Sequence, residues 1–186
     1  MPIIIPASLF RGANTRLRMV IPKVVEQLPA VTKACLRYTP DALIAASMSA
    51  AMNQILRHEL RRGEFAFLQH RWVRVQVTDL DFSFYVSVAA DEARPRLQVS
   101  VREQAADVTM RGEMPSLLLM ISNKVDPDTL FFRRKLLIAG DTELGLQIKN
   151  LLDTIELKER LPGFLYRLSD QVAEQILTQQ SLTGVN

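Results

Sequence analysis

The stretch LLIAGDTELGLQIKNLL, residues 136–152, decides the fold, because an apolar run ends at Gly140-Asp141 and the hydrophobic period then changes. After this corner the apolar side chains recur at helical spacing, namely at Leu144, Ile148, Leu151, Leu152 and Ile155. A strand is therefore predicted to turn directly into a helix. Asp141 or Thr142 is the expected N-cap of that helix, since either side chain can accept a hydrogen bond from its first turn.

A glycine-rich corner between a strand and a helix is also where phosphate-binding loops occur. Gly140 and Gly145 have the spacing G-x-x-x-x-G, but such a loop next requires a Lys and then a Ser or Thr. The residues in those places are Leu146 and Gln147, and Glu143 would put a negative charge beside a bound anion. The corner is therefore predicted to be structural rather than a nucleotide site.

Three segments with alternating apolar and polar residues precede this stretch, at residues 73–77, 82–88 and 97–101. Each is predicted to be a β-strand with one buried face, and the short connections make them antiparallel neighbours. A shorter strand is expected at residues 108–110. Residues 126–141 are expected to supply the last strand of the sheet.

Helical spacing predicts amphipathic helices around these strands. Thr39-Pro40 is typical of a helix start with Thr39 as the cap, and this helix is expected to run to residue 62, before Gly63. Residues 114–123 and 164–177 are expected to form two further helices. The chain is therefore predicted to be an α+β domain, with one mainly antiparallel sheet and helices on its apolar face.

Length and composition agree with one ordinary aliphatic core. The chain has 186 residues, of which 48% are hydrophobic and only 6% aromatic. Its single cysteine, Cys35, excludes an internal disulfide framework and points to the cytosol. No uninterrupted apolar stretch is long enough to span a bilayer, so the protein is expected to be soluble or peripheral to a membrane.

Positive charge is concentrated near the beginning of the chain, although the formal net charge is only +3. Four cations alternate with aliphatic residues there: Arg11, Arg16, Arg18 and Lys23. This pattern predicts contact with an anionic membrane surface. The alternative is a solvated helix face followed by an irregular arm.

The residue types that carry catalysis are few. His58 lacks the second histidine of H-E-x-x-H, while His70 and Cys35 have no identified partner, so neither a catalytic nor a metal site is predicted. A nucleic-acid surface is not expected either, because Phe82 and Phe84 share their strand face with valines and are assigned to the core.

The segment DPDTLFFRRKLLIAGDTELGLQIKNLLDTIE resembles the C-terminal signature of the sterol carrier protein type-2 (SCP2) domain family. The resemblance is carried by Phe131-Phe132, Lys135-Leu136, Ile138, Gly140-Asp141 and the Leu-rich helix that follows. Arg134 departs from the pattern, which commonly has Gly before the Lys. The implied organisation is a basic arm over residues 1–37, an SCP2-like lipid-binding domain over 38–160, and an amphipathic helix and tail over 161–186.

The resemblance implies a five-stranded sheet covered on one face by amphipathic helices that enclose an apolar tunnel. The candidates for its wall are residues on the apolar faces of the predicted strands and helices: Met48, Met52, Phe84, Val86, Met110, Leu118, Ile121, Ile148 and Leu152. The resemblance is more specifically to bacterial accessory factors of oxygen-independent ubiquinone biosynthesis. It implies prenylated ubiquinone intermediates or phospholipid as ligands and the UbiU and UbiV proteins as partners. A homodimer is left open, and no cofactor is expected.

Three function classes follow from these observations. The first is a non-catalytic lipid carrier, and the second is an enzyme domain for an acyl or isoprenoid substrate that uses His58, His70 or Cys35. The third is a structural interaction module whose tunnel is filled by its own side chains.

Overall fold

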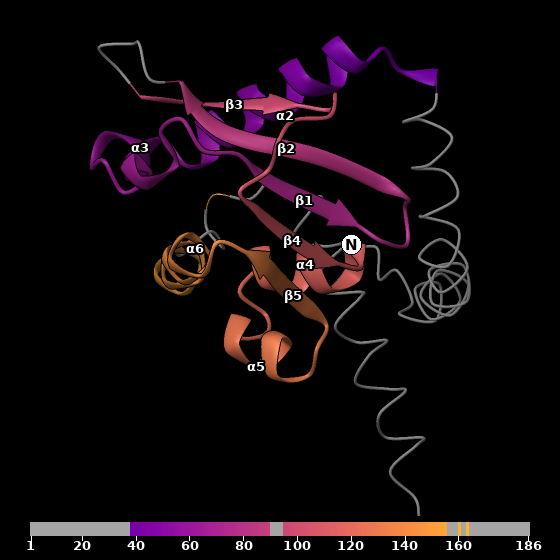
Figure 1. Cartoon of the computed structure of the whole chain (residues 1–186), viewed down its shortest axis with the longest axis vertical. Coiled ribbons are helices and arrows are strands. Elements are labelled where there is room, and N and C mark those ends of the chain that lie inside the picture. Colours follow the sequence, from indigo (N-terminus) through magenta and orange to yellow (C-terminus); the bar gives the residue numbers. More distant parts are fainter. Residues whose placement is uncertain (1–37, 90–94, 156–159, 161–162, 164–186) are drawn as a thin grey trace, which may run out of the picture.

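The computed structural model describes residues 38–89 and 95–155, together with residues 160 and 163 (Figure 1). The helices are α2 (Asp41–Ile55), α3 (Arg57–Arg61), the 3-10 turn η2 (Ala66–Leu68), α4 (Met114–Ile121), α5 (Pro127–Phe132) and α6 (Thr142–Thr154). The strands are β1 (Val73–Val77), β2 (Phe82–Ala89), β3 (Arg96–Ser100), β4 (Val108–Gly112) and β5 (Leu136–Gly140). Three features expected from the sequence lie outside the described residues: the basic arm with its four cations, Cys35, and the helix at 164–177.

The five strands form one sheet in the order β3-β2-β1-β4-β5, so β1 is central. Three of the four strand pairs are antiparallel, which confirms the mainly antiparallel sheet. The exception is β1 with β4, which are parallel with Val75 opposite Met110. This pairing arises because the chain passes from the edge strand β3 to the far side of β1 before β4 begins.

The period-two pattern places one side chain in the interior and the next toward the other face. Val73, Val75 and Val77 of β1 are all buried, whereas Arg74 and Gln76 between them are only half-buried. The register continues the apolar face across the neighbouring strands, since Val75 lies opposite Phe84 on β2 and Met110 on β4. The α+β class predicted from the sequence is confirmed. The expectation of one buried face for each strand is wrong for β2, since Tyr85, Val86, Ser87 and Val88 are all buried. The hydroxyl of Ser87 donates to the carbonyl of Leu68 in η2.

Helices α4 and α6 lie close against this apolar face. A Cβ placed on Gly145 of α6 would lie 2.9 Å from Cγ2 of Ile138 on β5, so α6 approaches the strand closely. Likewise, a Cβ on Gly112 would meet the side chains of Leu136 and Leu117, the second of which belongs to α4. Figure 1 shows α6 and α4 beside β5 and β4, with α5 at the outer end of this layer.

Helix α2 covers the free edge of β3. The side-chain amide of Asn53 donates to the carbonyl of Leu97 at 2.7 Å and accepts from its N–H at 2.9 Å. The hydroxyl of Ser49, one turn earlier, accepts from the N–H of Val99 at 3.0 Å. Polar side chains of α2 thus occupy backbone groups that an open edge would offer to another strand.

Two sequence-based expectations about helices are wrong. The helix expected from Thr39 to residue 62 starts at Asp41 with Pro40 as N-cap, and it is interrupted at Leu56, so that α3 is separate. Residues 126–141 are not all strand, because Asp126 caps a short helix and accepts from the N–H of Asp128 at 3.0 Å. Proline at the first position of α5 adds to this helix start. The strand is confined to β5.

Helices α3, α4 and α5 end in the same way. In each, the second residue after the helix has positive φ: Gly63 (76°), Asn123 (53°) and Arg134 (55°). The N–H groups of this residue and the next bond back to carbonyls of the last turn, as from Arg134 to Phe131 and from Lys135 to Leu130. This is the Schellman arrangement, which satisfies carbonyls that a helix end leaves open.

Candidate functional site

The nine residues predicted to line a tunnel come from α2, β2, β4, α4 and α6. Val86, Met110 and Ile148 belong to the main hydrophobic core, and Met52, Phe84, Ile121 and Leu152 pack against it. Leu118 is also buried, with 7% of its surface exposed, whereas Met48 is half-buried and outside that cluster. The structure therefore brings most of the predicted residues to one interior. That they line an open tunnel stays a prediction.

The corner at the end of β5 has the predicted structural role. Gly140 has φ +118°, and a Cβ there would collide with the backbone carbonyl of Asp107. The carboxylate of Asp141 accepts from the N–H of Leu144 at 2.9 Å, which confirms Asp141 as the N-cap of α6. The guanidinium of Arg71 lies 3.4 Å from the other oxygen of Asp141. The loop is thus held by its own cap and an ion pair.

The two histidines are not brought into a reactive cluster. The side chain of His58 is 64% exposed, and its Nδ1 lies 3.9 Å from Glu59, while His70 is exposed with φ +60° at the entry to β1. Within the described part of the chain, no three His, Cys, Asp or Glu side chains lie close enough to hold a metal ion. The carboxylate of Asp79, at the β1–β2 turn, accepts from the N–H of Met114 at 2.8 Å.

Glu59 is the buried charge that the sequence did not reveal. It is only 5% exposed, and both of its carboxylate oxygens accept from Nη1 of Arg160 at 2.7 Å. Burial by itself raises the pKa of this carboxyl. The hydrogen bonds from Arg160 and from its own backbone, with the positive charges of Arg160 and His58, outweigh burial, so the pKa is lowered from its ordinary value.

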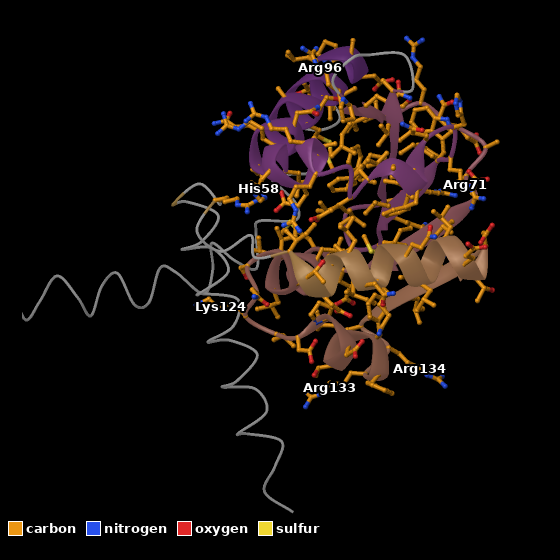
Figure 2. The ribbon with its side chains drawn as sticks, turned by 90° about the vertical axis from the view of Figure 1, so that its left-hand side faces the viewer. His58, Arg71, Arg96, Lys124, Arg133 and Arg134 are labelled. Atoms are coloured by element: carbon orange, nitrogen blue, oxygen red, sulfur yellow. The ribbon has the colours of Figure 1, made fainter. Side chains whose placement is uncertain are left out.

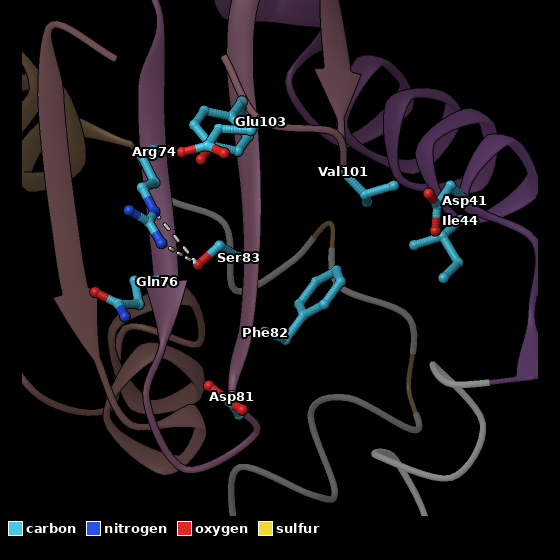
Figure 3. Close-up of a pocket in the computed structure, with 10 residues that line it drawn as sticks. Asp41, Ile44, Arg74, Gln76, Asp81, Phe82, Ser83, Val101 and Glu103 are labelled. Carbon is cyan, nitrogen blue, oxygen red and sulfur yellow. Dashed lines mark hydrogen bonds between the residues drawn. The ribbon is translucent and has the colours of Figure 1, made fainter. Parts of the chain in front are cut away.

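A second feature is a polar cavity of about 440 Å³ beyond the end of β3 (Figure 3). Figure 3 shows Arg74 directed at Ser83, whose hydroxyl lies 3.2 Å from the guanidinium, with Asp41 of α2 across the opening. Val101 and Glu103, which follow β3, also line the cavity. None of the nine predicted tunnel residues lines this cavity, so it is distinct from the apolar interior.

The sequence was also compared with models of known protein families. Residues 52–153, more than half of the chain, match the SCP-2 sterol transfer family. The chain belongs to this family. The matched segment begins in α2 and ends in α6, and it therefore contains the whole sheet with its apolar face.

Among curated proteins, the chain is similar to the "Ubiquinone biosynthesis accessory factor UbiT" of Escherichia coli K12. The two are 38% identical over 152 residues, which cover 82% of this chain and 84% of that protein. The UbiT of Escherichia coli O157:H7 matches with the same identity and coverage. The resemblance proposed from the sequence signature is confirmed.

Solved structures were also compared. The chain matches the "UbiJ-SCP2 Ubiquinone synthesis protein" with a TM-score of 0.49 and 19% identity, over 62% of this chain and 97% of that one. It matches the sterol carrier protein domain 2 of Helicoverpa armigera with a TM-score of 0.43 and 17% identity, over 61% of this chain and 88% of that domain.

No helix in the described part of the chain is both long and apolar enough to cross a membrane.

Proposed function

We propose that this chain is a non-catalytic, lipid-binding accessory factor of ubiquinone biosynthesis that acts without oxygen. Its ligands are prenylated intermediates or phospholipid, held in the apolar interior, and UbiU and UbiV are its protein partners. It works in the cytoplasm and at the periphery of the inner membrane. The observation that carries the proposal is the 38% identity to UbiT over 82% of the chain.

The physics of the interior supports a carrier. Burying one CH₂ group is worth about 0.8 kcal/mol, so ten methylenes of a prenyl or acyl chain supply on the order of 8 kcal/mol before ordering costs. A binding site of this kind needs apolar surface and no reactive side chain. Three of the nine proposed wall residues are methionines, Met48, Met52 and Met110, whose flexible thioethers adapt to ligands of irregular shape.

Organic extraction of the gently purified full chain, with identification of the extract by mass spectrometry, tests the proposal. We expect a prenylated quinone precursor or a phospholipid in the wild-type extract. Met52→Trp should carry less lipid, since the larger ring occupies the proposed wall. Leu43→Trp is the matched control on α2, because Leu43 is 60% exposed and should leave the lipid content unchanged.

Two results contradict the proposal. The first is wild-type protein that contains no extractable lipid and binds none when supplied with a prenylated quinone. The second is an equal lipid content in Met52→Trp and in Leu43→Trp while both variants remain folded.

A further inference from the structure

The corner between α5 and β5 exposes the aromatic ring of Phe132. Its exposed fraction is 87%, the highest among the large hydrophobic side chains of the described residues. The chain on either side is firmly anchored, since Leu130 is 4% exposed and Leu136 is fully buried. Phe132 is therefore held outward by a fixed turn.

Three consecutive cations follow this ring. Arg133, Arg134 and Lys135 are all exposed, and none of their side chains has an ion-pair partner among the residues that the structure describes. The closest acidic side chain along α5, Asp128, is already paired with Lys149 at 2.5 Å. Figure 2 shows Arg133 and Arg134 projecting outward from the end of the molecule formed by α5. We call Phe132, Arg133, Arg134 and Lys135 the α5–β5 corner.

The backbone at Arg134 gives a second, independent observation. Of the three Schellman turns, α3 uses Gly63 and α4 uses Asn123 at the position with positive φ, which are the residue types best suited to it. The corner instead has arginine at φ +55°. Residue types other than Gly, Asn and Asp are disfavoured there, so the turn alone does not account for a cation at this position.

We propose that the α5–β5 corner docks the protein on an anionic phospholipid bilayer. Phe132 enters the boundary between headgroups and acyl chains, and the three cations lie at the level of the lipid phosphates. The long stems of Arg133, Arg134 and Lys135 can lie on apolar surface while their charges stay in water. The cations complement anionic lipid phosphates, and the projecting ring of Phe132 can enter a bilayer. This combination favours a bilayer over a folded acidic protein, because an aromatic ring cannot insert into a close-packed protein surface.

This inference extends the proposed function, since a carrier must reach the bilayer that holds its apolar cargo. It also differs from the expectation for the N-terminal arm, because it places a contact on a rigid turn of the domain itself. The two contacts can be separated experimentally, since the corner variants retain residues 1–37.

The test is flotation of the full chain with vesicles of equal parts phosphatidylglycerol and phosphatidylcholine, compared with phosphatidylcholine alone. Arg134→Gly should weaken partition onto the anionic vesicles about fivefold, because each cation near such a surface contributes about that factor. Its melting temperature should be unchanged or higher, because glycine fits φ +55° without strain. This variant therefore separates binding from folding.

A second pair of variants tests the aromatic ring. Phe132→Ser should weaken partition on the order of tenfold through loss of apolar insertion, and Phe132→Trp should retain it. Leu146→Ser on α6, where the side chain is 56% exposed, is the apolar control. Arg102→Ser is the charge control, since Arg102 is exposed beyond β3. Both controls should bind within twofold of the wild type.

Three outcomes overturn the inference. One is wild-type partition in both Arg134→Gly and Phe132→Ser. Another is equal binding of the wild type to anionic and neutral vesicles. The third is unchanged vesicle binding while the corner variants lose activity in cells, which assigns the corner to a protein partner. Lipid extraction from the same preparations is scored separately, so an empty interior contradicts the proposed function and leaves the docking result standing.

Discussion

Gly140 shows how one residue fixes the junction between β5 and α6. Its φ of +118° and the backbone carbonyl of Asp107 leave no room for a side chain. Gly140→Ala should lower the free energy of unfolding by more than about 2 kcal/mol, from strain and collision together. Gly63→Ala is the matched control, since Gly63 also has positive φ but no atom within 4 Å of an added Cβ. It should cost about 1 kcal/mol. If urea denaturation gave the same loss of unfolding free energy for Gly140→Ala and Gly63→Ala, a collision between the added Cβ and the carbonyl of Asp107 would be contradicted.

The pair of Glu59 and Arg160 predicts a dependence of stability on pH. The pKa of Glu59 is lowered in the folded chain from an ordinary value of 4.5. Above pH 4.5 the carboxylate is charged in both the folded and the unfolded chain, and the pair stabilises fully. As the pH falls below this value the unfolded chain takes up the proton first, so stability is lost.

Glu59→Gln should therefore reduce the free energy of unfolding by about 1–3 kcal/mol at neutral pH, and by less as the solution is acidified. Urea denaturation of both proteins between neutral and acidic pH measures this. Arg160→Gln completes a double-mutant cycle that isolates the pair. A constant difference between wild type and Glu59→Gln at every pH would show that the titration of Glu59 is not linked to folding.

The sequence predicts local features of single residues better than distant ones. Asp141 could be assigned as an N-cap because its partner, the N–H of Leu144, lies three residues away. The role of Glu59 could not be predicted, since Arg160 is separated from it by 101 residues. Met48 occupies an apolar helical position but lies outside the main core. The sequence could not show this, because the hydrophobic period of a helix does not tell how much of its apolar face is covered.

At the scale of elements, the contact between α2 and β3 depends on side-chain hydrogen bonds. Asn53→Ala leaves the edge N–H and carbonyl of Leu97 without their partner, which should cost about 1–3 kcal/mol. Amide exchange at Leu97 should accelerate by more than exchange at Val75 in central β1. Asn53→Asp keeps the acceptor for the N–H of Leu97 but places a carboxylate oxygen against its carbonyl, so it should protect this N–H without restoring stability. Unchanged exchange at Leu97 in Asn53→Ala would show that α2 does not protect this edge.

The hydrophobic period of the sequence predicted which segments are strands, but it did not predict how the strands pair. The alternation of apolar and polar residues located β1, β2 and β3. It did not show that β2 is buried on both faces from Tyr85 to Val88. The parallel pairing of β1 with β4 depends on a crossover that no local pattern encodes. Helix α5 was missed because six residues are too few for a helical period, although Asp126-Pro127 carried the start signal.

At the scale of the whole molecule, the family identity and the geometry support different parts of the functional argument. The sheet and helices gather aliphatic residues in one interior, and the reactive residues of the described part lie outside it. The similarity to UbiT supports a biosynthetic role for such an interior. The hydrophobic spacing of the sequence does not identify a ligand. Residues of a filled aliphatic core and residues that line a lipid tunnel have the same spacing.

A cellular experiment separates carriage from catalysis. Deleting the gene should abolish ubiquinone only in cells grown without oxygen, as the proposed role requires. A triple replacement, His58→Asn, His70→Asn and Cys35→Ser, should still restore ubiquinone, because it removes every candidate reactive group and leaves the apolar interior intact. Met52→Trp should restore less ubiquinone at an equal protein level, since its ring would occupy the space needed for the lipid. The reverse pattern, an inactive triple variant and a fully active Met52→Trp, would show that the chain is an enzyme rather than a carrier.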